Sequence, residues 1–219
     1  MFYTSVAIMA HPSREKMVER LVERLDCALT VVWDDKQDRI DTGIRALRSI
    51  TPGATHHTVI QDDARVPKYL VIGINRILDS PAFRKDVPLC LYAGNVGYFA
   101  GKFQQAFRRR TYSWITMTGL NWGVGVTIPA LDIEPLTNFM LARSEPQYDL
   151  RMSRYFERRK VPVWYPIPSL IDHDPGPSLI EGHGHSRRAW RFIGEHNSAL
   201  NFDMELGAVH LPLTRRHIG

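Results

Sequence analysis

Two adjacent carboxylates, Asp62 and Asp63, directly follow a short apolar run that is typical of a buried strand. In open α/β sheets, ligands bind at the carboxyl ends of the strands, so these acids stand where a ligand would bind. Two neighbouring carboxylates repel each other unless a cation or a proton lies between them. Oxygen ligands at an open site suit Mg²⁺ or Mn²⁺ carrying a phosphorylated substrate. The alternative interpretation is a solvated acidic turn.

Alternation of side chains along a strand separates the roles of these residues. Gln61 and Asp63 share one face, whereas Asp62 points to the other. Asp63 is therefore the candidate metal ligand, and Gln61 can hydrogen-bond a ribose hydroxyl. A second apolar run, residues 29–33, ends in Asp34 and Asp35. A carboxylate there can accept a hydrogen bond from a base N–H or a ribose hydroxyl, and a turn or helix-capping role is the alternative.

Histidines late in the chain are further candidate metal ligands. His173 follows an apolar run and precedes a Pro-Gly turn. Neutral imidazole is a common metal ligand, although a lone loop histidine is usually only solvated. His183 and His185 are alternatives. Together with Asp172 these histidines could also form a zinc site, but their spacing matches no known zinc motif.

Asp149 and Arg14 are candidates for acid–base chemistry and for phosphate binding. Asp149 stands at the start of a predicted helix, where it either stabilises the helix dipole or acts as a general base toward an acceptor hydroxyl. Arg14 follows the first strand and could reach a diphosphate, as could the N–H groups of the first helix. Neither a Walker motif nor G-x-G-x-x-G is present. The pair His56-His57 is interpreted as packing or surface residues.

The elements that must position these residues alternate regularly over the first 80 residues. Predicted strands cover Thr4–Ala10, 29–33 and 57–61. Predicted helices cover Glu15–Leu25 after a Ser13 N-cap, 41–50 with Asp41 or Thr42 as the cap, and 67–78. This alternation predicts a parallel sheet with helices on both faces. The polar ends of all three strands should therefore meet at one edge.

The second half of the chain is less regular. Predicted strands cover 88–93, 112–118, 122–128 and 161–167, and predicted helices cover 133–142 and Tyr148–Arg159. Gly94, Gly97 and Gly101 are expected to break the segment after the first of these strands. Because Pro162 and Pro166 interrupt the last strand, we expect it at an edge of the sheet.

The formal net charge of +5 favours an anionic partner. Three basic clusters carry interleaved aromatic residues, a pattern suited to nucleic acid, with solvated helix faces as the alternative. The basic members are Lys102, Arg108, Arg109 and Arg110, then Arg151, Arg154, Arg158, Arg159 and Lys160, then Arg187, Arg188 and Arg191. The aromatic members are Phe103, Phe107 and Tyr112, then Tyr155 and Phe156, then Trp190 and Phe192.

Composition also bears on the compartment. Cys27 and Cys90 are far apart and lack metal-type spacing, so a disulfide scaffold is not expected and a reducing cytoplasm is. No run approaches the roughly 20 apolar residues of a membrane span. The N-terminal residues lack a basic region and a small-residue cleavage site, so they are interpreted as a first strand instead of a signal peptide.

The order of these segments resembles the glycosyltransferase-A fold, and specifically the small glycosyltransferases encoded by bacteriophages. The resemblance rests on the polar strand ends, on D-x-G-x-R-A at residues 41–46, on Q-D-D at 61–63 and on P-S-L-I-D-H at 168–173 followed by Ser178-Leu179. It covers residues 6–194. It implies a single α/β domain over 1–219 with a mixed, mainly parallel, Rossmann-like sheet and helices on both faces. Residues 1–80 would form the nucleotide-binding half, 86–195 the acceptor and metal-completing half, and 196–219 a tail.

The resemblance also implies roles for individual residues. Asp63 would bind Mn²⁺ or Mg²⁺ as part of a D-x-D motif whose first position is Gln61 here, and His173 or His183 would complete the metal and diphosphate site. The remaining implied roles fall into three groups. Asp34 or Asp35 would contact the nucleobase, with His11 beside it. The donor would be bound by Arg14, Arg45, Gln61 and Asp62. Gly123 and Gly125 would line the pocket for the donor sugar and the acceptor, with Asp149 as the base of an inverting enzyme.

The implied activity is metal-dependent transfer of a sugar from a nucleoside-diphosphate sugar, with a UDP-sugar favoured, to a hydroxyl acceptor. Phage DNA with a hydroxylated base is one expected acceptor, and a phage structural protein or a host glycan are the others. A nucleotidyltransferase of similar fold would favour a Gly-rich, Lys-containing loop after the first strand, which residues 11–14 lack. A non-enzymatic nucleic-acid-binding protein fits the basic clusters, but the two Asp-Asp pairs would repel phosphate without a bridging cation.

Overall fold

Three parallel strands at the N-terminus form the part of the sheet that carries the acidic residues. The computed structural model describes residues 2–96, 100–109, 112–174, 176, 179 and 187–211. Strands β1 (Thr4–Ala10), β2 (Thr30–Trp33) and β3 (His56–Gln61) lie side by side, with β1 in the middle. The register pairs Ala10 with Trp33 and Met9 with Gln61. All three strands therefore end at the same edge, as the alternating pattern predicts.

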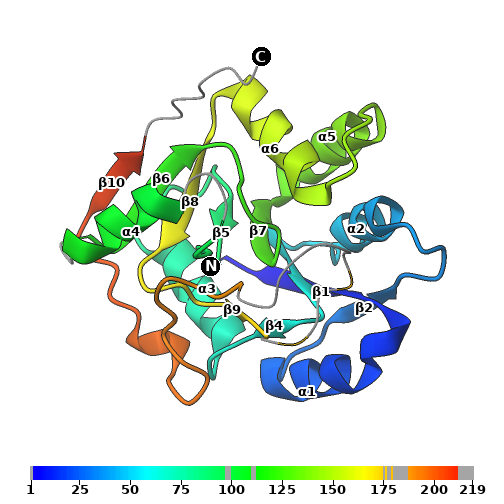
Figure 1. The fold of residues 1–219 in the computed structure, drawn as a ribbon, viewed down its shortest axis with the longest axis horizontal. Helices are drawn as coiled ribbons and strands as arrows, with labels where there is room; N and C mark the ends of the chain where they lie inside the picture. The colour runs from blue at the N-terminus through cyan, green and yellow to red at the C-terminus, as the bar shows by residue number, and fades with distance from the viewer. Residues whose placement is uncertain are drawn as a thin grey trace.

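The remaining strands extend this sheet to eight (Figure 1). They are β5 (Leu89–Cys90), β6 (Trp114–Thr118), β7 (Gly125–Pro129), β8 (Pro162–Pro166) and β10 (Ala208–Leu211). The order is β10-β6-β8-β5-β7-β3-β1-β2. Strand β7 runs antiparallel to both β3 and β5, and β6 antiparallel to β8, whereas the other pairs are parallel. The fold is thus α/β with a mixed, mostly parallel sheet.

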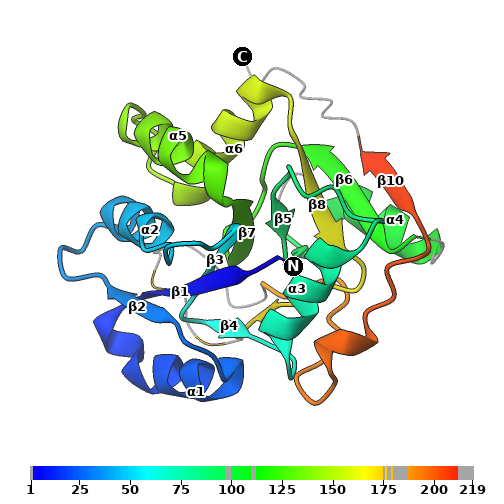
Figure 2. The same cartoon turned by 180° about the vertical axis from the view of Figure 1, so that it is seen from behind.

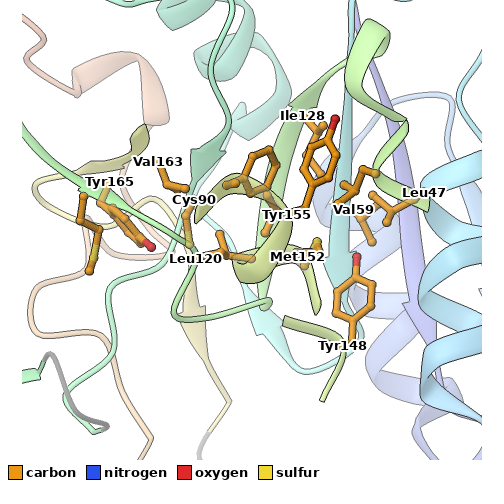
Figure 3. Close-up of a cluster of buried hydrophobic side chains, with 14 of the residues drawn as sticks. Leu47, Val59, Cys90, Leu120, Ile128, Tyr148, Met152, Tyr155, Val163 and Tyr165 are labelled. Carbon is orange, nitrogen blue, oxygen red and sulfur yellow. The ribbon is translucent and has the colours of Figure 1, made fainter. Parts of the chain in front are cut away.

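Helices cover both faces of the sheet. Helices α2 (Arg39–Arg48), α4 (Ala100–Arg109), α5 (Ala130–Leu141) and α6 (Tyr148–Arg159) contribute to one hydrophobic core, and α1 (Glu15–Leu25) and α3 (Leu70–Asp79) contribute to the other. Figures 1 and 2 show α2, α5 and α6 grouped together, away from α1 and α3. Figure 3 shows α6 side chains packing with residues of β3 and α2 in the first core.

Helix α1 illustrates why these segments adopt their observed structure. Its apolar residues Val18, Leu21 and Leu25 recur at helical spacing and are buried against the sheet. Each such side chain stabilises the fold by about 1.5–3 kcal/mol. Asp26 ends the helix in the left-handed conformation, with its N–H bonded to the carbonyl of Val22.

Helix α1 has the predicted bounds, but its predicted cap is wrong, and so are the predicted starts of α2 and α3. Ser13 does not cap α1, because residues Pro12–Arg14 form a 3₁₀ turn and the Ser13 hydroxyl bonds the ring of His11. Helix α2 begins at Arg39, and its cap is Asp38, whose carboxylate accepts from two backbone N–H groups. Helix α3 begins only at Leu70, since Tyr69 before it has a positive φ of 57°. The observed cap therefore precedes the predicted position in α2 and follows it in α1 and α3.

The expected edge position of the strand around Pro162 and Pro166 is also wrong. Strand β8 lies inside the sheet between β6 and β5. Successive N–H groups of a strand point to opposite neighbours, so the two prolines face the same side as the N–H of Trp164, which bonds the carbonyl of Pro88. The neighbour on that side, β5, is only two residues long. The missing proline N–H groups therefore cost few ladder bonds.

The predicted strands 112–118 and 122–128 correspond to β6 and β7, which are not neighbours in the sheet. One prediction for the glycines of the second half needs correction. Gly101 does not interrupt the secondary structure, because it lies within α4, where an added Cβ would meet no atom within 4 Å. Gly97 lies outside the described residues. None of the helices in the described ranges has the length and apolarity needed to span a bilayer.

A separate two-stranded sheet brings distant segments together beside the strand ends. Strands β4 (Ala64–Arg65) and β9 (Asp172–His173) pair antiparallel, with Ala64 opposite His173. The N–H of Asp174 also donates to the carbonyl of Asp63 at 2.8 Å. This pairing fixes a late segment of the chain against the residues that directly follow β3.

Candidate functional site

A cavity of about 520 Å³ opens at the carboxyl ends of β1, β2 and β3, and is called the main cavity below. Its position is the one where open α/β sheets bind ligands. The structure brings seven of the predicted site residues together around it. They are His11, Arg14, Asp34, Gln61, Asp62, Asp63 and His173.

Arg14 binds both carboxylates of the acidic pair. Its Nη1 atom lies 2.7 Å from Oδ1 of Asp62 and 2.6 Å from Oδ2 of Asp63. The side chains of the two acids are only 6% and 7% exposed. The 3₁₀ turn after β1 directs Arg14 across the end of β3. The predicted acidic pair is therefore buried and charge-compensated, which excludes the interpretation as a solvated turn.

The two carboxylates differ in their surroundings. Asp62 accepts a second hydrogen bond, from the backbone N–H of His11 at 2.7 Å, so both of its oxygens are bonded. Burial raises the pKa of Asp62, although Arg14 and this N–H oppose the rise. Burial alone would lower the pKa of Arg14, but the charges of Asp63 and Asp62 and their hydrogen bonds raise it above its ordinary value, so the guanidinium stays protonated.

Asp63 has an oxygen without a protein partner. Its Oδ1 atom is buried and has no hydrogen-bond partner among the described residues. Because a buried polar atom without a partner costs free energy, such an atom in a cavity indicates a missing ligand or ion. The Nε2 atom of His173 lies 3.5 Å from the other oxygen, Oδ2. Asp63 and His173 therefore present one carboxylate and one imidazole to the main cavity.

This pair of donors fits a divalent cation that shares its coordination with a substrate. Mg²⁺ sites typically use one or two carboxylates together with substrate phosphates and water, and imidazole and carboxylate both suit Mn²⁺. No group of three or more His, Cys, Asp or Glu side chains that could hold a metal occurs in the described part of the chain. A cation held by Asp63 and His173 would therefore depend on oxygens from a bound ligand.

The zinc alternative receives no support from Asp172. Its Oδ1 accepts from the N–H of Ala189 at 2.7 Å, and its Oδ2 lies 2.8 Å from Nη2 of Arg188. The carboxylate is 3% exposed and is therefore occupied by these partners. His183 and His185 lie outside the described residues.

The Asp34-Asp35 pair is divided by the structure. Asp34 lines the main cavity, and its Oδ1 accepts from the hydroxyl of Thr42 and the N–H of Asp38. Asp35 is 65% exposed and pairs with Arg45 at 2.6 Å. Arg45 also pairs with Asp41, which holds it away from both cavities. Asp34 is thus the acid placed for a ligand, and Asp35 with Arg45 stabilises the segment behind it.

A smaller cavity of about 150 Å³, called the side cavity, adjoins the main one. The two share five lining residues, namely Met9, Arg39, Gln61, His173 and Arg187. Asp149 and Gly123 line the side cavity, together with Trp122 and Tyr92. A carboxylate therefore lies on the far side of the shared residues from Asp62 and Asp63. Groups bound in the two cavities would meet at Gln61 and His173.

Packing around two glycines positions Asp149. A Cβ at Gly43 of α2 would lie 2.3 Å from ring atoms of Tyr148, the residue before Asp149. A Cβ at Gly123 would lie 3.3 Å from the Cβ of Asp149 itself. Gly125, in contrast, lines neither cavity, because it packs beneath Ile171, where a Cβ would lie 2.3 Å from Cδ1. Gly125 is thus a packing glycine of β7.

Sequence reasoning missed several lining residues, above all Arg187 and Arg39. Arg187 lines both cavities and is fixed by the segment after it, where Arg188 exchanges two hydrogen bonds with Asn95. Arg39 is the first residue of α2, and its Nε donates to the carbonyl of Pro146. The only sequence signal for Arg187 is its membership of a basic cluster. The partners that place it are distant in sequence.

Most aromatic residues of the basic clusters do not form the stacking surfaces that the sequence pattern predicts. Phe103, Phe107, Tyr155 and Phe156 are buried in the first hydrophobic core. The α6 arginines also have internal partners. Arg154 pairs with Glu157, Arg159 pairs with Asp132, and Arg151 donates to the carbonyls of Glu145 and Met140. In the described part of these clusters, only Tyr112, Trp190 and Phe192 keep partly exposed rings.

No protein-family model matches the chain, and no curated protein matches it significantly. The resemblance to glycosyltransferase-A enzymes therefore stays a prediction from the order of the segments. The function proposed below depends on the two adjoining cavities and their charged groups.

Proposed function

We propose that this protein is a glycosyltransferase that moves a sugar from a nucleoside-diphosphate sugar to a hydroxyl acceptor with the help of a divalent cation. The observation that carries the proposal is the pair of adjoining cavities, with Asp63 and His173 in the larger and Asp149 in the smaller. A two-substrate transfer needs two such spaces that meet at the reacting atoms. Gln61 and His173, which line both cavities, would lie beside the reacting atoms.

The main cavity has the groups that a nucleoside diphosphate requires. At one end, the second oxygen of Asp34 can accept from a base N–H, such as the N3–H of uracil. Gln61 can donate to or accept from a ribose hydroxyl. Arg14 and Arg187 provide positive charge for phosphate oxygens. The volume of about 520 Å³ lies within the range of ordinary small-molecule sites.

Asp63 and His173 would hold a Mn²⁺ or Mg²⁺ ion together with the diphosphate. When bound, such an ion stabilises the negative charge that develops on the leaving diphosphate. The buried Oδ1 of Asp63 would gain the partner it lacks among the described residues. The buried position of Asp63, 5% exposed, would strengthen the interaction by excluding water.

Asp149 would act on the acceptor. In the proposed step, the acceptor oxygen attacks the anomeric carbon, its proton passes to the Asp149 carboxylate, and the bond from that carbon to the phosphate oxygen breaks. The nucleoside diphosphate then leaves with the electron pair. Asp149 is fixed at the start of α6, and its Oδ1 accepts from the N–H of Leu150. General-base assistance of this kind contributes roughly 10²–10⁴-fold.

The side cavity favours an acceptor that presents one ring or one side chain. Its volume of about 150 Å³ corresponds to the liquid volume of roughly five water molecules. Trp122 and Tyr92 offer apolar surface, and Gln147 and Asp149 offer polar partners. A hydroxylated base of phage DNA, a residue of a phage structural protein and a glycan hydroxyl are the acceptors to compare. The basic clusters of the protein favour a DNA acceptor less than the sequence suggested, because most of the aromatic rings in these clusters are buried.

The test is turnover of a UDP-sugar with Mn²⁺ by the wild-type protein and by Asp63→Ala. Donor turnover in the variant should fall by about a hundredfold or more, the size of effect seen when one preorganised electrostatic contact is removed from a transition state. Glu19→Ala, which removes an exposed carboxylate of α1, is the matched control and should retain activity. Undiminished turnover in Asp63→Ala would refute the assignment of the site.

The donor base is tested in the same assay across UDP-, GDP- and CMP-sugars. A UDP-sugar should be turned over best, as the resemblance to glycosyltransferase-A enzymes implies. A nucleotidyltransferase would instead consume a nucleoside triphosphate and release pyrophosphate, so measuring pyrophosphate release separates this alternative. A non-enzymatic nucleic-acid-binding protein would turn over none of these donors.

A further inference from the structure

The guanidinium of Arg14 contacts Oδ2 of Asp63, the oxygen that also faces Nε2 of His173, so it competes with any cation that these two residues would hold together. Its Nη1 bridges Oδ1 of Asp62 and Oδ2 of Asp63 at 2.7 and 2.6 Å. The Arg14 side chain is itself only 13% exposed, so water screens these contacts weakly. One positive charge thus faces two negative charges, and the group keeps one excess negative charge.

The contacts of Asp62 and Asp63 indicate which of them can exchange its partner. Both oxygens of Asp62 are bonded, one to Arg14 and the other to the N–H of His11. Asp63 has a buried Oδ1 without a partner among the described residues and has Nε2 of His173 3.5 Å from Oδ2. Asp62 is therefore a fixed anchor for Arg14, and Asp63 is the carboxylate that is incompletely satisfied.

We infer that Arg14 is a built-in counter-ion of Asp63, and that a divalent cation binds by taking its place on that carboxylate while Arg14 stays on Asp62. The inference rests on the proposed function only in requiring a divalent cation and a nucleoside diphosphate in the main cavity. It assigns Arg14 a positioning role that the sequence does not indicate.

This arrangement has a consequence for the order of binding. With Arg14 on Asp62 and a divalent ion on Asp63, the group carries an excess of one positive charge. The metal ion and the Arg14 guanidinium would lie close together and repel each other, so the metal alone should bind weakly. A negatively charged diphosphate bound between the metal ion and Arg14 attracts both, so the repulsion between the two cations is replaced by attraction to the diphosphate. Metal and nucleoside diphosphate should therefore each raise the affinity for the other by the same factor.

The experiment measures Mn²⁺ binding directly, from the electron paramagnetic resonance signal of free Mn²⁺, with and without UDP. Arg14→Gln should bind Mn²⁺ about tenfold more tightly than wild type in the absence of UDP, because it removes the competing charge. UDP should raise the Mn²⁺ affinity of the wild type more than that of Arg14→Gln. Arg20→Gln removes the same charge from an exposed position on α1, the helix that follows Arg14, and should bind Mn²⁺ as the wild type does.

A second measurement uses the wild-type protein and does not depend on the folding of a variant. The Arg14 side-chain N–H signals, followed by nuclear magnetic resonance, should shift when diamagnetic Mg²⁺ and UDP are added, because the guanidinium loses Asp63. Unchanged Arg14 signals at saturating Mg²⁺ and UDP would overturn the inference. Equal or weaker Mn²⁺ binding by folded Arg14→Gln would do so as well.

The outcomes separate this inference from the proposed function. If the wild type turns over a UDP-sugar only with Mn²⁺ but Arg14→Gln gains no affinity, the inference fails and the proposed function stands. If the wild type binds no Mn²⁺ even with UDP, the metal-dependent function fails and the inference fails with it.

Discussion

The contact between Gly43 and Tyr148 allows a specific test of how the fold positions Asp149. A Cβ added at Gly43 would lie 2.3 Å from Cδ2 and Cε2 of Tyr148, against an ordinary contact of at least 3.4 Å. The ring is buried, with 4% of Tyr148 exposed, and Tyr148 lines the side cavity. In Gly43→Ala, we therefore expect the ring and the start of α6 to move together by about 1 Å. Asp149, the next residue, moves with it.

The expected stability of Gly43→Ala is the difference between two effects. Overpacking of a core costs about 1–3 kcal/mol, and replacing glycine by alanine inside a helix contributes about 1 kcal/mol in the opposite direction. The net loss should thus be about 0–2 kcal/mol. For a chain of this length, each kcal/mol lowers the melting temperature by about 2–4 °C, so the decrease should not exceed about 8 °C.

The expected effect on activity is larger and selective. A misplacement of 1 Å can reduce a rate by about a hundredfold, so transfer to the acceptor should fall by that order. Binding of UDP and Mn²⁺, measured by calorimetry, should stay close to wild type, because Asp63 follows β3 and His173 lies in β9, so neither is carried by α6. Gly101→Ala is the matched control, since a Cβ there meets nothing within 4 Å.

The result that refutes this reasoning is a Gly43→Ala protein with stability and transfer rate equal to those of Gly101→Ala. Such a result would mean that the Tyr148 ring adjusts without moving α6. The double variant Gly43→Ala/Tyr148→Leu tests the cause, because the smaller side chain relieves the contact. If the contact is responsible, the stability losses of the two single variants will not add.

Two further predictions concern Asp149 and the buried histidines. Asp149→Asn should lower transfer by about 10²–10⁴-fold, with UDP affinity in the presence of Mn²⁺ close to wild type, and equal loss of both would make Asp149 a structural residue. Burial lowers the pKa of His56 and His57 below 6.5, so unfolding takes up protons below that pH and the free energy of unfolding should decrease as the pH falls from 6.5. Urea unfolding between pH 8 and pH 5 measures this decrease, which should be smaller in His57→Gln. A pH-independent free energy of unfolding would contradict the prediction.

The convergence of the strand ends was predictable because it depends on local pattern and one topological rule. Thr4–Ala10 and Tyr148–Arg159 were predicted with the bounds that the structure has. Once β1, β2 and β3 are parallel, Asp34, Asp62 and Asp63 must end at one edge. These residues do line one cavity. Short-range signals therefore sufficed for half of the candidate site.

The rest of the site depends on contacts between distant segments. His173 reaches Asp63 because β9 pairs with β4, and Arg187 reaches the main cavity because Asp172 and Asn95 hold the residues that follow it. Nothing in the local sequence specifies these partners. The position of β8 was misjudged for the same reason, since the effect of its prolines depends on the length of the neighbouring strand β5.

The division of charged groups between the two cavities leads to a prediction about stereochemistry. Of the two adjoining cavities, Asp62 and Asp63 line the main one, Asp149 lines the side one, and Gln61 and His173 line both. A sugar whose diphosphate is bound near Asp63 would therefore present the opposite side of its anomeric carbon to Asp149. Attack by the acceptor from that side inverts the anomeric configuration. The coupling constant of the anomeric proton in the first product formed, measured by nuclear magnetic resonance, should correspond to the inverted anomer. A product of retained configuration would mean that the acceptor attacks from the diphosphate side, and Asp149 would then lose its role as the base.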